Sequence, residues 1–238
     1  MQLFYCPNIQ GQQAILEEDE FRHACKTLRK KEGDQLHLFD GRGHYYLAQI
    51  AKTSKREARL DILEQEERPL PWSFSLHLAL APTKNMDRME WLVEKAVEVG
   101  VNKISLFLSQ QSERKKVRMD RLQRIALSAA KQSHKWVLPE WGELQKLTDF
   151  LPQQTAQHRF IAHCHASDLP LLKAACPKTI GLKEEILILL GPEGDFSWPE
   201  VEMAEAAGFQ SVSLGHSRLR TETAALYVCQ GIQWELGQ

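Results

Sequence analysis

Hydrophobic and polar residues follow two different patterns along the chain, which divides into two parts. In the first part, apolar runs over 36–39 and 45–50 flank Asp-Gly-Arg-Gly, which predicts a β-hairpin because the turn glycines tolerate positive φ. A third strand is predicted near 58–63, and the helical spacing of apolar residues over 20–30 predicts one short helix. The pattern therefore indicates a small, mostly β domain over 1–66.

The segment 64–71 is charged and carries two prolines, so we interpret it as a linker. Over 72–238, apolar runs alternate with amphipathic stretches, which predicts an α/β fold with a parallel sheet covered by helices on both faces. Asp87 is the predicted N-cap of the first helix, and Ser197 begins a capping-box pattern. The predicted strands are 76–81, 103–108, 159–163, 186–190 and 211–214, and the predicted helices begin near 87, 120, 197 and 222.

The composition is that of an ordinary globular protein, with 43% hydrophobic and 26% charged residues among 238. The 30 Lys and Arg nearly balance the 31 Asp and Glu, and a net charge of −1 excludes nucleic-acid binding by bulk charge. No apolar run approaches the roughly 20 residues that span a bilayer, and residues 1–7 lack the features of a signal peptide. Five scattered cysteines indicate reduced thiols. We therefore expect a cytoplasmic protein with no membrane segment.

Two loops carry residues suited to ligand binding. Gly-Pro-Glu-Gly at 191–194 follows the most apolar predicted strand, and 215–223 follows the last one. Ligands on parallel sheets bind beyond the carboxyl ends of strands, where glycines allow close approach and helix starts offer free N–H groups. Ordinary turns have the same composition, and spacing alone slightly favours that interpretation. The sequence has no phosphate-loop, dinucleotide-loop or serine-elbow motif.

A His-Cys-His run at 163–165 is the one pattern that could suggest a metal. Adjacent residues of a strand point to opposite faces, so only His163 and His165 could share an ion. Local packing at the end of a strand is the simpler interpretation, and the sequence supplies no recognisable base for Cys164. We therefore predict no metal and no nucleophilic cysteine.

Five motifs in a fixed order resemble a known family. Residues 191–197 are Gly-Pro-Glu-Gly-Asp-Phe-Ser, and 214–224 are Leu-Gly-His-Ser-Arg-Leu-Arg-Thr-Glu-Thr-Ala. The other motifs lie at 87–101, 112–114 and 129–133, and 21–23 resembles the family's opening. Together they resemble, over nearly the whole chain, the RsmE family of the SPOUT superfamily. These are 16S ribosomal RNA (uridine-N3) methyltransferases whose target is uridine 1498 in the usual rRNA numbering.

The resemblance implies a fold that periodicity cannot show. The second part, 72–238, should be a SPOUT domain with a deep trefoil knot over about 187–226, an exception to the rule against knots. The first part, 1–66, should be a PUA-like RNA-binding β-barrel. The family is homodimeric, with the site near the dimer interface, and S-adenosylmethionine should lie in the knot. The residues implied as cofactor-binding are His163, Gly191, Pro192, Glu193, Gly194, Leu214, Gly215, Leu219, Arg220 and Thr221.

The reaction implied by the resemblance is methyl transfer to N3 of a uridine. N3 carries a proton and is a poor nucleophile until the proton is lost, so a base or donors to the flanking carbonyl oxygens must help. Arg220 and Arg114 are candidate electrostatic stabilisers, and Glu222 or Glu193 could accept the proton. Both glutamates could instead bind backbone at helix starts, and Arg220 could be a plain salt-bridge partner.

Local clusters of positive charge are the candidates for RNA binding. Three occur in a nearly neutral chain, and phosphate contacts set affinity while the base is read elsewhere. Each cluster taken singly could be a solvated face. The implied partner is 16S rRNA within the 30S subunit. The candidate RNA-binding residues are Arg22, Lys26, Arg29, Lys30, Arg88, Arg114, Lys115, Gln132 and Ser133.

The sequence departs from the family pattern at several positions. Asp195 and His134 stand where many members have glycine, and the approach to the first helix over 83–87 is a variant. Two other functions stay open: a non-catalytic RNA-binding or ribosome-associated protein on the same fold, and an unrelated small-molecule enzyme. Binding of S-adenosylmethionine separates the methyltransferase from both.

Overall fold

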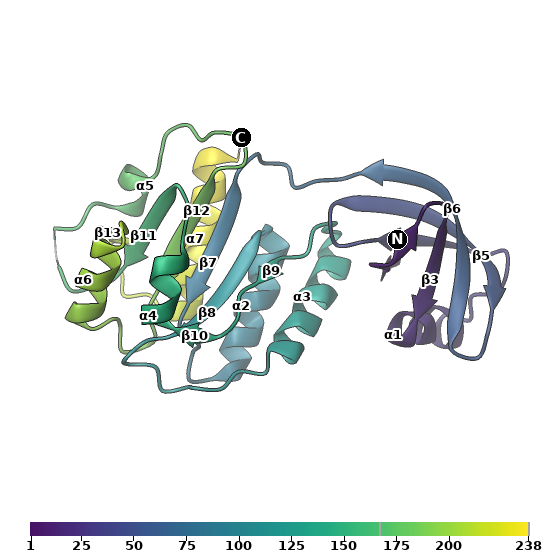
Figure 1. Cartoon of the computed structure of the whole chain (residues 1–238), viewed down its shortest axis with the longest axis horizontal. Helices are drawn as coiled ribbons and strands as arrows, with labels where there is room; N and C mark the ends of the chain where they lie inside the picture. Colours follow the sequence, from purple (N-terminus) through teal and green to yellow (C-terminus); the bar gives the residue numbers. More distant parts are fainter. Residues whose placement is uncertain (167, 238) are drawn as a thin grey trace. The chain divides into compact units, whose positions relative to one another are not determined.

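A computed structural model describes residues 1–166 and 168–237, which form two compact units. The first unit combines Met1–Leu70 with Leu127–Leu138, and the second combines Pro71–Ala126 with Pro139–Gln238. Figure 1 labels most of the helices and strands of both. The segment 127–138 lies within the part that the sequence analysis assigned to the second domain, yet it packs with the first unit.

The first unit is built on a curled, mostly antiparallel sheet with strand order β1-β4-β5-β6-β3-β2. The predicted hairpin is confirmed, with Phe39 opposite Tyr45 at its turn. The last strand extends to Glu67, so the first half of the predicted linker is strand instead. The predicted helix is a short α1 (Glu18–Phe21) followed by a π-helical turn (Arg22–Thr27). The strands are β1 (Leu3–Tyr5), β2 (Ile9–Gln10), β3 (Gln13–Glu17), β4 (Gln35–Phe39), β5 (His44–Thr53) and β6 (Glu57–Glu67).

Backbone hydrogen bonds explain why 127–138 belongs to the first unit. The Gly43 amide donates to the Trp136 carbonyl at 3.0 Å, and the Leu138 amide donates to the Gly41 carbonyl at 2.8 Å. Residues 136–138 therefore bridge to the hairpin turn, and Lys131 Nζ lies 2.7 Å from the Glu20 carboxylate of α1. Sequence periodicity could not find this, because the pairing joins residues far apart in the chain.

The second unit contains the predicted parallel sheet, with strand order β10-β8-β7-β12-β11-β13 and β9 paired to β8. Every strand pair in it is parallel. The strand β12 is buried along almost its whole length because it lies between β7 and β11. The strands are β7 (Ser75–Leu80), β8 (Lys103–Leu108), β9 (Glu140–Trp141), β10 (Gln145–Lys146), β11 (His158–Ala162), β12 (Glu185–Leu190) and β13 (Gln210–Val212).

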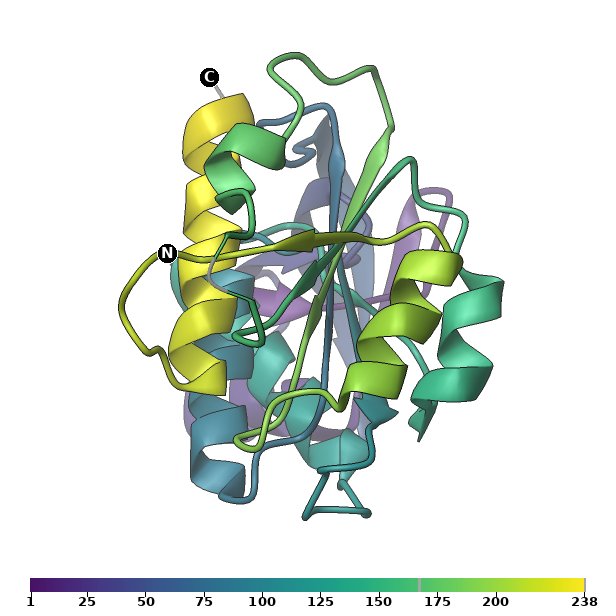
Figure 2. The ribbon, with the colours of Figure 1, turned by 90° about the vertical axis from the view of Figure 1, so that its left-hand side faces the viewer.

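Helices cover both faces of this sheet, as the alternation predicted. Figure 2 shows α2 and α7 on one side, and α4 and α6 on the other. The last helix, α7, packs against α2 although the strand before it, β13, lies at the far edge of the sheet. The knot over 187–226 stays a prediction. The helices are α2 (Met86–Val99), α3 (Met119–Ser133), α4 (Leu147–Phe150), the 3-10 turn Leu151–Gln153, α5 (Leu172–Ala175), α6 (Trp198–Ala206) and α7 (Thr221–Leu236).

The predicted starts of α2, α3, α6 and α7 lie within one residue of the observed ones. The predicted capping box is present, since the Ser197 amide donates to the Glu200 carboxylate at 2.8 Å. The predicted cap at Asp87 is wrong. Asn85 caps α2 instead, and its side chain accepts a hydrogen bond from the Asp87 amide at 2.8 Å. An asparagine at this position serves as well as an aspartate, because both offer a side-chain oxygen to a free helix N–H.

Candidate functional site

Three loops leave neighbouring strands at the same edge of the parallel sheet. Ala162 at the end of β11 is paired with Leu190 of β12 and with Val212 of β13. The loops 163–166, 191–197 and 213–220 therefore start side by side at the carboxyl ends of the strands. This is the edge at which open α/β sheets bind their ligands.

Hydrogen bonds tie these loops to one another. The Cys164 amide donates to the Asp195 carboxylate at 2.8 Å, and a ring nitrogen of His165 contacts the Phe196 carbonyl at 2.5 Å. The Thr221 hydroxyl donates to the Gly191 carbonyl at 3.1 Å. The structure thus brings together the segments that contain His163, 191–194 and Thr221, as the cofactor hypothesis requires.

Asp195 keeps the left-handed backbone that a glycine would adopt at this position. Its φ is +64°, and its other carboxylate oxygen accepts the amide of Phe196 at 2.8 Å. Aspartate tolerates this region because a short polar side chain can bond to nearby backbone. His134, the second departure from glycine, also has a positive φ of +53°. Both residues therefore adopt a backbone conformation that glycine favours.

His163 offers an unused hydrogen-bonding atom at this edge. The side chain is buried, its Nδ1 accepts the His165 amide at 3.3 Å, and its Nε2 is buried with no hydrogen-bond partner in the described chain. Burial lowers the pKa of His163, which favours the neutral ring. A buried polar atom without a partner costs free energy unless a ligand satisfies it. His163 therefore fits a bound polar molecule.

The glycines of the two loops differ in what surrounds them. A Cβ at Gly191 would lie 3.2 Å from the backbone of Asp195 and Phe196, and one at Gly194 would lie 3.2 Å from Gln111. These two glycines allow the loop to pack on the protein itself. Gly215 has a φ of +112° and open space around a Cβ, so a ligand can approach its Cα closely, while its amide donates to the Ser213 hydroxyl at 3.1 Å.

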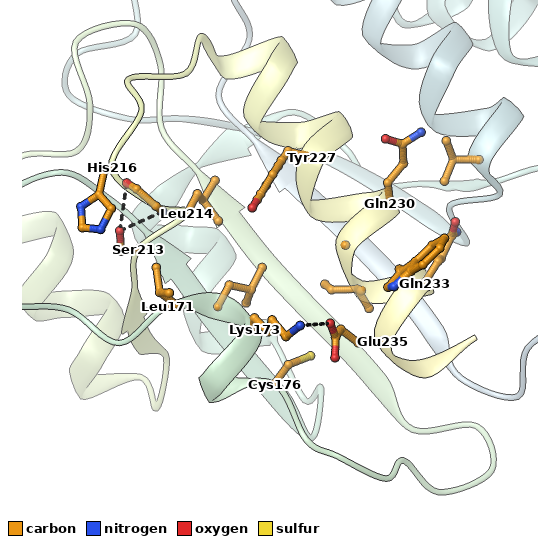
Figure 3. A pocket seen from close by; sticks show the side chains of 16 residues that line it. Leu171, Lys173, Cys176, Ser213, Leu214, His216, Tyr227, Gln230, Gln233 and Glu235 are labelled. Atoms are coloured by element: carbon orange, nitrogen blue, oxygen red, sulfur yellow. Dashed lines mark hydrogen bonds and ion pairs between the residues drawn. The ribbon is translucent and has the colours of Figure 1, made fainter. Parts of the chain in front are cut away.

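A large pocket of about 970 Å³ opens between α5, the loop 213–216 and the C-terminal half of α7 (Figure 3). Leu214 and Gly215 line it, together with exposed Tyr227 and Trp234. The other predicted cofactor residues do not line this pocket. The predicted cofactor residues therefore do not all line one pocket. Leu214 and Gly215 line this pocket, whereas Gly191 and Thr221 lie where the loops are hydrogen-bonded to one another.

A second pocket of about 330 Å³ lies between α2 and the start of α7. Arg220 and Glu222 line it, with Arg88 and Trp91 from α2. Arg88 Nε is 3.6 Å from Glu222 Oε1, while Glu222 Oε2 is buried and without a hydrogen-bond partner in the part of the chain described. The structure thus joins two candidate catalytic residues with one candidate RNA-binding residue.

Glu193 and Arg114 are engaged elsewhere. The Glu193 carboxylate accepts the Lys84 amide at 2.9 Å, and Arg114 donates to the Lys84 carbonyl through Nε at 3.0 Å and Nη2 at 2.5 Å. Both side chains therefore hold the loop before α2. For Glu193 this matches the alternative in which it binds backbone at a helix start.

The remaining candidate RNA-binding residues lie mostly on exposed surface. Arg22 pairs with Asp19, and the Ser133 hydroxyl donates to the Ala129 carbonyl at 2.7 Å. Lys115 and Gln132 are exposed. Trp91 was not among the site residues predicted from the sequence. Its position three residues after Arg88 would have indicated it, because residues at this spacing are neighbours on the surface of a helix.

The part of the chain that the structure describes has neither a metal-binding cluster nor a membrane-spanning helix. Within 1–166 and 168–237, no group of three or more His, Cys, Asp or Glu residues could hold a metal ion. None of the helices found there is long and apolar enough to cross a bilayer.

Two family models match this chain, one in each part of it. A family model described as "RNA methyltransferase domain" matches residues 70–233, and one described as "RNA methyltransferase PUA domain" matches residues 16–63. The ribosomal RNA small subunit methyltransferase E of Aquifex aeolicus is 28% identical over 233 residues, covering 96% of this chain and 97% of that protein. The chain belongs to the ribosomal RNA small subunit methyltransferase E family.

Solved structures agree with that assignment. A probable rRNA-methyltransferase from Porphyromonas gingivalis is 39% identical, with a TM-score of 0.86 over 98% of both chains. The methyltransferase E of Neisseria gonorrhoeae, solved bound to S-adenosyl methionine, is 27% identical, with a TM-score of 0.81 over 98% of this chain and 97% of that one. The resemblance drawn from five motifs is thereby confirmed, as is the mixed α/β fold with a PUA-like first domain.

Proposed function

We propose that this protein methylates N3 of a uridine in the 16S rRNA of the small ribosomal subunit, with S-adenosylmethionine as the methyl donor. One observation carries the proposal: three loops meet at the carboxyl ends of β11, β12 and β13, in a chain whose fold matches a cofactor-bound methyltransferase E over nearly its full length. A non-catalytic RNA-binding protein would have the same fold. It would not need a buried atom without a hydrogen-bond partner, such as His163 Nε2, at this edge of the sheet.

The cofactor would supply an electrophilic methyl group on a sulfonium. His163 Nε2 is a buried atom in need of a partner, and the space where a Cβ of Gly215 would lie is open, so the residues present fit such a group. We infer that the loop 191–194, residues 214–215 and residues 219–221 form the rest of the site. A deep knot over 187–226 would hold these segments together and is part of the proposal.

The chain's own residues can handle the proton on N3. Glu222 lines the second pocket, so its carboxylate can accept that proton as the N3–H bond breaks, and the electron pair stays on the ring and spreads to O2 and O4. Arg220, in the same pocket, can stabilise this negative charge. Arg114, proposed from the sequence as a stabiliser, would act instead by positioning the loop before α2.

We also infer that the protein acts in the cytoplasm as a homodimer, on rRNA within the 30S subunit. Tyr227 and Trp234 on α7 are 54% and 75% exposed. Large apolar side chains at such exposure beside a pocket are typical of a surface that another chain covers. Analytical ultracentrifugation tests this: a dimer is expected, and a monomer at all accessible concentrations refutes it.

Calorimetry and rRNA mapping test the function. We expect S-adenosylmethionine to bind, and we expect Gly194→Trp to abolish binding because its side chain would collide with Gln111 beside the loop. Hydrogen exchange of the first unit should stay unchanged in this variant. Retained binding would refute the placement of the site.

Mass spectrometry of 16S rRNA from a deletion strain tests the reaction itself. Loss of N3-methyluridine, restored by the wild-type gene, is the expected result. If the modified base survives the deletion, this protein is not the enzyme, and the RNA-binding alternative is favoured.

A further inference from the structure

We propose that the loop before α2, residues 81–85, is a preorganised phosphate-binding loop in which Lys84 contacts the RNA backbone and Glu193 is a positioning residue. This inference rests on the proposed function, because it names how the RNA is held next to the cofactor loop. The sequence suggested Glu193 as a cofactor contact or a proton acceptor, and it did not suggest Lys84 as an RNA-binding residue.

The loop leaves the parallel sheet at the same edge as the cofactor loop. Leu80 at the end of β7 pairs with Leu190 at the end of β12, and the Ala81 amide donates to the Leu190 carbonyl at 3.0 Å. Thr83 is fully buried, whereas the Lys84 side chain is 69% exposed. Lys84 therefore presents a positive charge to solvent at the edge where open α/β sheets bind their ligands.

Charged side chains fix the backbone of Lys84 on both sides. Its amide donates to the Glu193 carboxylate at 2.9 Å, and its carbonyl accepts Arg114 Nε at 3.0 Å. The Thr83 hydroxyl closes the loop by donating to the Asn85 carbonyl at 2.7 Å. Hydrogen bonds to ionised groups are roughly twice as strong as those between neutral groups. The loop is therefore held in one shape before a ligand arrives, which lowers the entropy that binding costs.

The Lys84 ammonium is held less firmly than its backbone. Its Nζ lies 2.7 Å from the Glu113 carboxylate, and the two side chains are 69% and 58% exposed. Ion pairs at such exposure contribute little to stability, because water and salt screen them. The ammonium can therefore exchange Glu113 for a phosphate at low cost.

The charges around Lys84 favour a ligand that carries several phosphates. Residues 84, 113–116 and 193 carry four positive and two negative charges, in a chain whose net charge is −1. Lys115 and Lys116 are exposed beside Arg114. A single small anion at Lys84 would lie near two carboxylates, whereas an RNA strand can contact several of these positive side chains at once. Such contacts set the position of the RNA and do not read its sequence.

The first experiment measures the binding of 30S subunits from a deletion strain at 50 and 200 mM KCl and constant magnesium concentration. Each phosphate contact lowers the affinity about two- to threefold between these salt concentrations. Lys84→Gln should therefore weaken binding at 50 mM KCl and reduce the rise in Kd between the two by about two- to threefold. The control Lys183→Gln removes the same charge from an exposed lysine just before β12, at the opposite edge of the sheet, and should keep the wild-type salt dependence. An unchanged salt dependence in Lys84→Gln, or an equal reduction in the control, refutes the contact.

The second experiment separates positioning by Glu193 from the effect of its charge. Loss of a carboxylate from an RNA-binding surface should by charge alone strengthen binding. Glu193→Ala removes the acceptor of the Lys84 amide, so we expect it to weaken binding of 30S subunits at least about threefold, measured without cofactor. Glu193→Gln keeps an acceptor oxygen and should bind at least as tightly as the wild type, and Glu113→Gln, which frees the ammonium, should bind more tightly. If Glu193→Ala binds as tightly as Glu193→Gln, the positioning role is wrong.

The experiments distinguish a failure of this inference from a failure of the proposed function. If the deletion strain keeps its N3-methyluridine but Lys84→Gln alone lowers the salt dependence, the phosphate contact stands and the reaction is wrong. If the deletion strain loses N3-methyluridine and Lys84→Gln binds like the wild type at both salt concentrations, the reaction stands and the phosphate contact is wrong. The Lys84 side chain is exposed, so this variant stays informative even if Glu193→Ala does not fold.

Discussion

Replacing Asp195 tests how the loop after β12 is held in shape. The side chain accepts two amides, from Cys164 and from Phe196, each at 2.8 Å, while its backbone is left-handed. Asp195→Ala removes both acceptors and leaves a Cβ in the left-handed region. Asp195→Gly removes the acceptors but relieves the backbone. Asp195→Asn keeps one oxygen and a side chain that tolerates this conformation.

The expected losses of unfolding free energy follow from these contacts. Each hydrogen bond to this partly buried carboxylate contributes about 1 kcal/mol. Alanine adds about 1–2 kcal/mol of left-handed strain, and glycine adds about 0.5–1 kcal/mol through the entropy of the unfolded chain. The expected total loss of unfolding free energy is about 1 kcal/mol for Asp195→Asn, about 2.5–3 kcal/mol for Asp195→Gly and about 3–4 kcal/mol for Asp195→Ala.

Urea unfolding followed by tryptophan fluorescence measures these losses. At a slope of about 3 kcal/mol per molar urea, the alanine variant should unfold at a concentration about 1 M lower. The Cys164 amide should also lose protection from hydrogen exchange in the Gly and Ala variants. The reasoning fails if Asp195→Ala lies within about 1 kcal/mol of wild type, or if it is more stable than Asp195→Gly.

Two further predictions concern buried polar side chains. His77 is fully buried and contacts Glu185 at 2.7 Å and Ser105 at 2.8 Å. Burial lowers the pKa of His77 from the usual 6.5, so the unfolded chain binds the proton at a higher pH than the folded chain does. The free energy of unfolding should therefore fall as the pH drops below about 6.5. The pH dependence of urea unfolding should be shallower in His77→Gln than in a control at exposed His216, and an unchanged slope contradicts this. Glu200 accepts the Gln110 amide at 2.7 Å and the Ser197 amide at 2.8 Å, so Glu200→Ala should lose about 2–4 kcal/mol of unfolding free energy, against about 1 for Ser197→Ala. Equal losses in urea unfolding would show that the contact with Gln110 contributes nothing.

The sequence by itself determined the elements whose signals are local. The continuous apolar run of β12 indicates a strand covered on both faces, and the capping box at Ser197 fixes where α6 begins. Gly100 ends α2 in the left-handed conformation that glycine favours. The ordered motifs fixed the family, because five weak signals in one order are specific together.

The tertiary structure decided what depends on residues far apart in the chain. The Cys164 amide donates to Asp195, which is 31 residues away, and residues 136–138 pair with the hairpin turn of the first unit. Arg114 reaches the carbonyl of Lys84, and Trp91 shares a pocket with Glu222. Helix and strand periodicity depends on neighbours within a few positions, whereas these contacts arise from how the sheet and its helices pack. For this reason sequence patterns predicted the elements and the family. Only the folded chain showed which side chains hold loops by hydrogen bonds and which face a pocket.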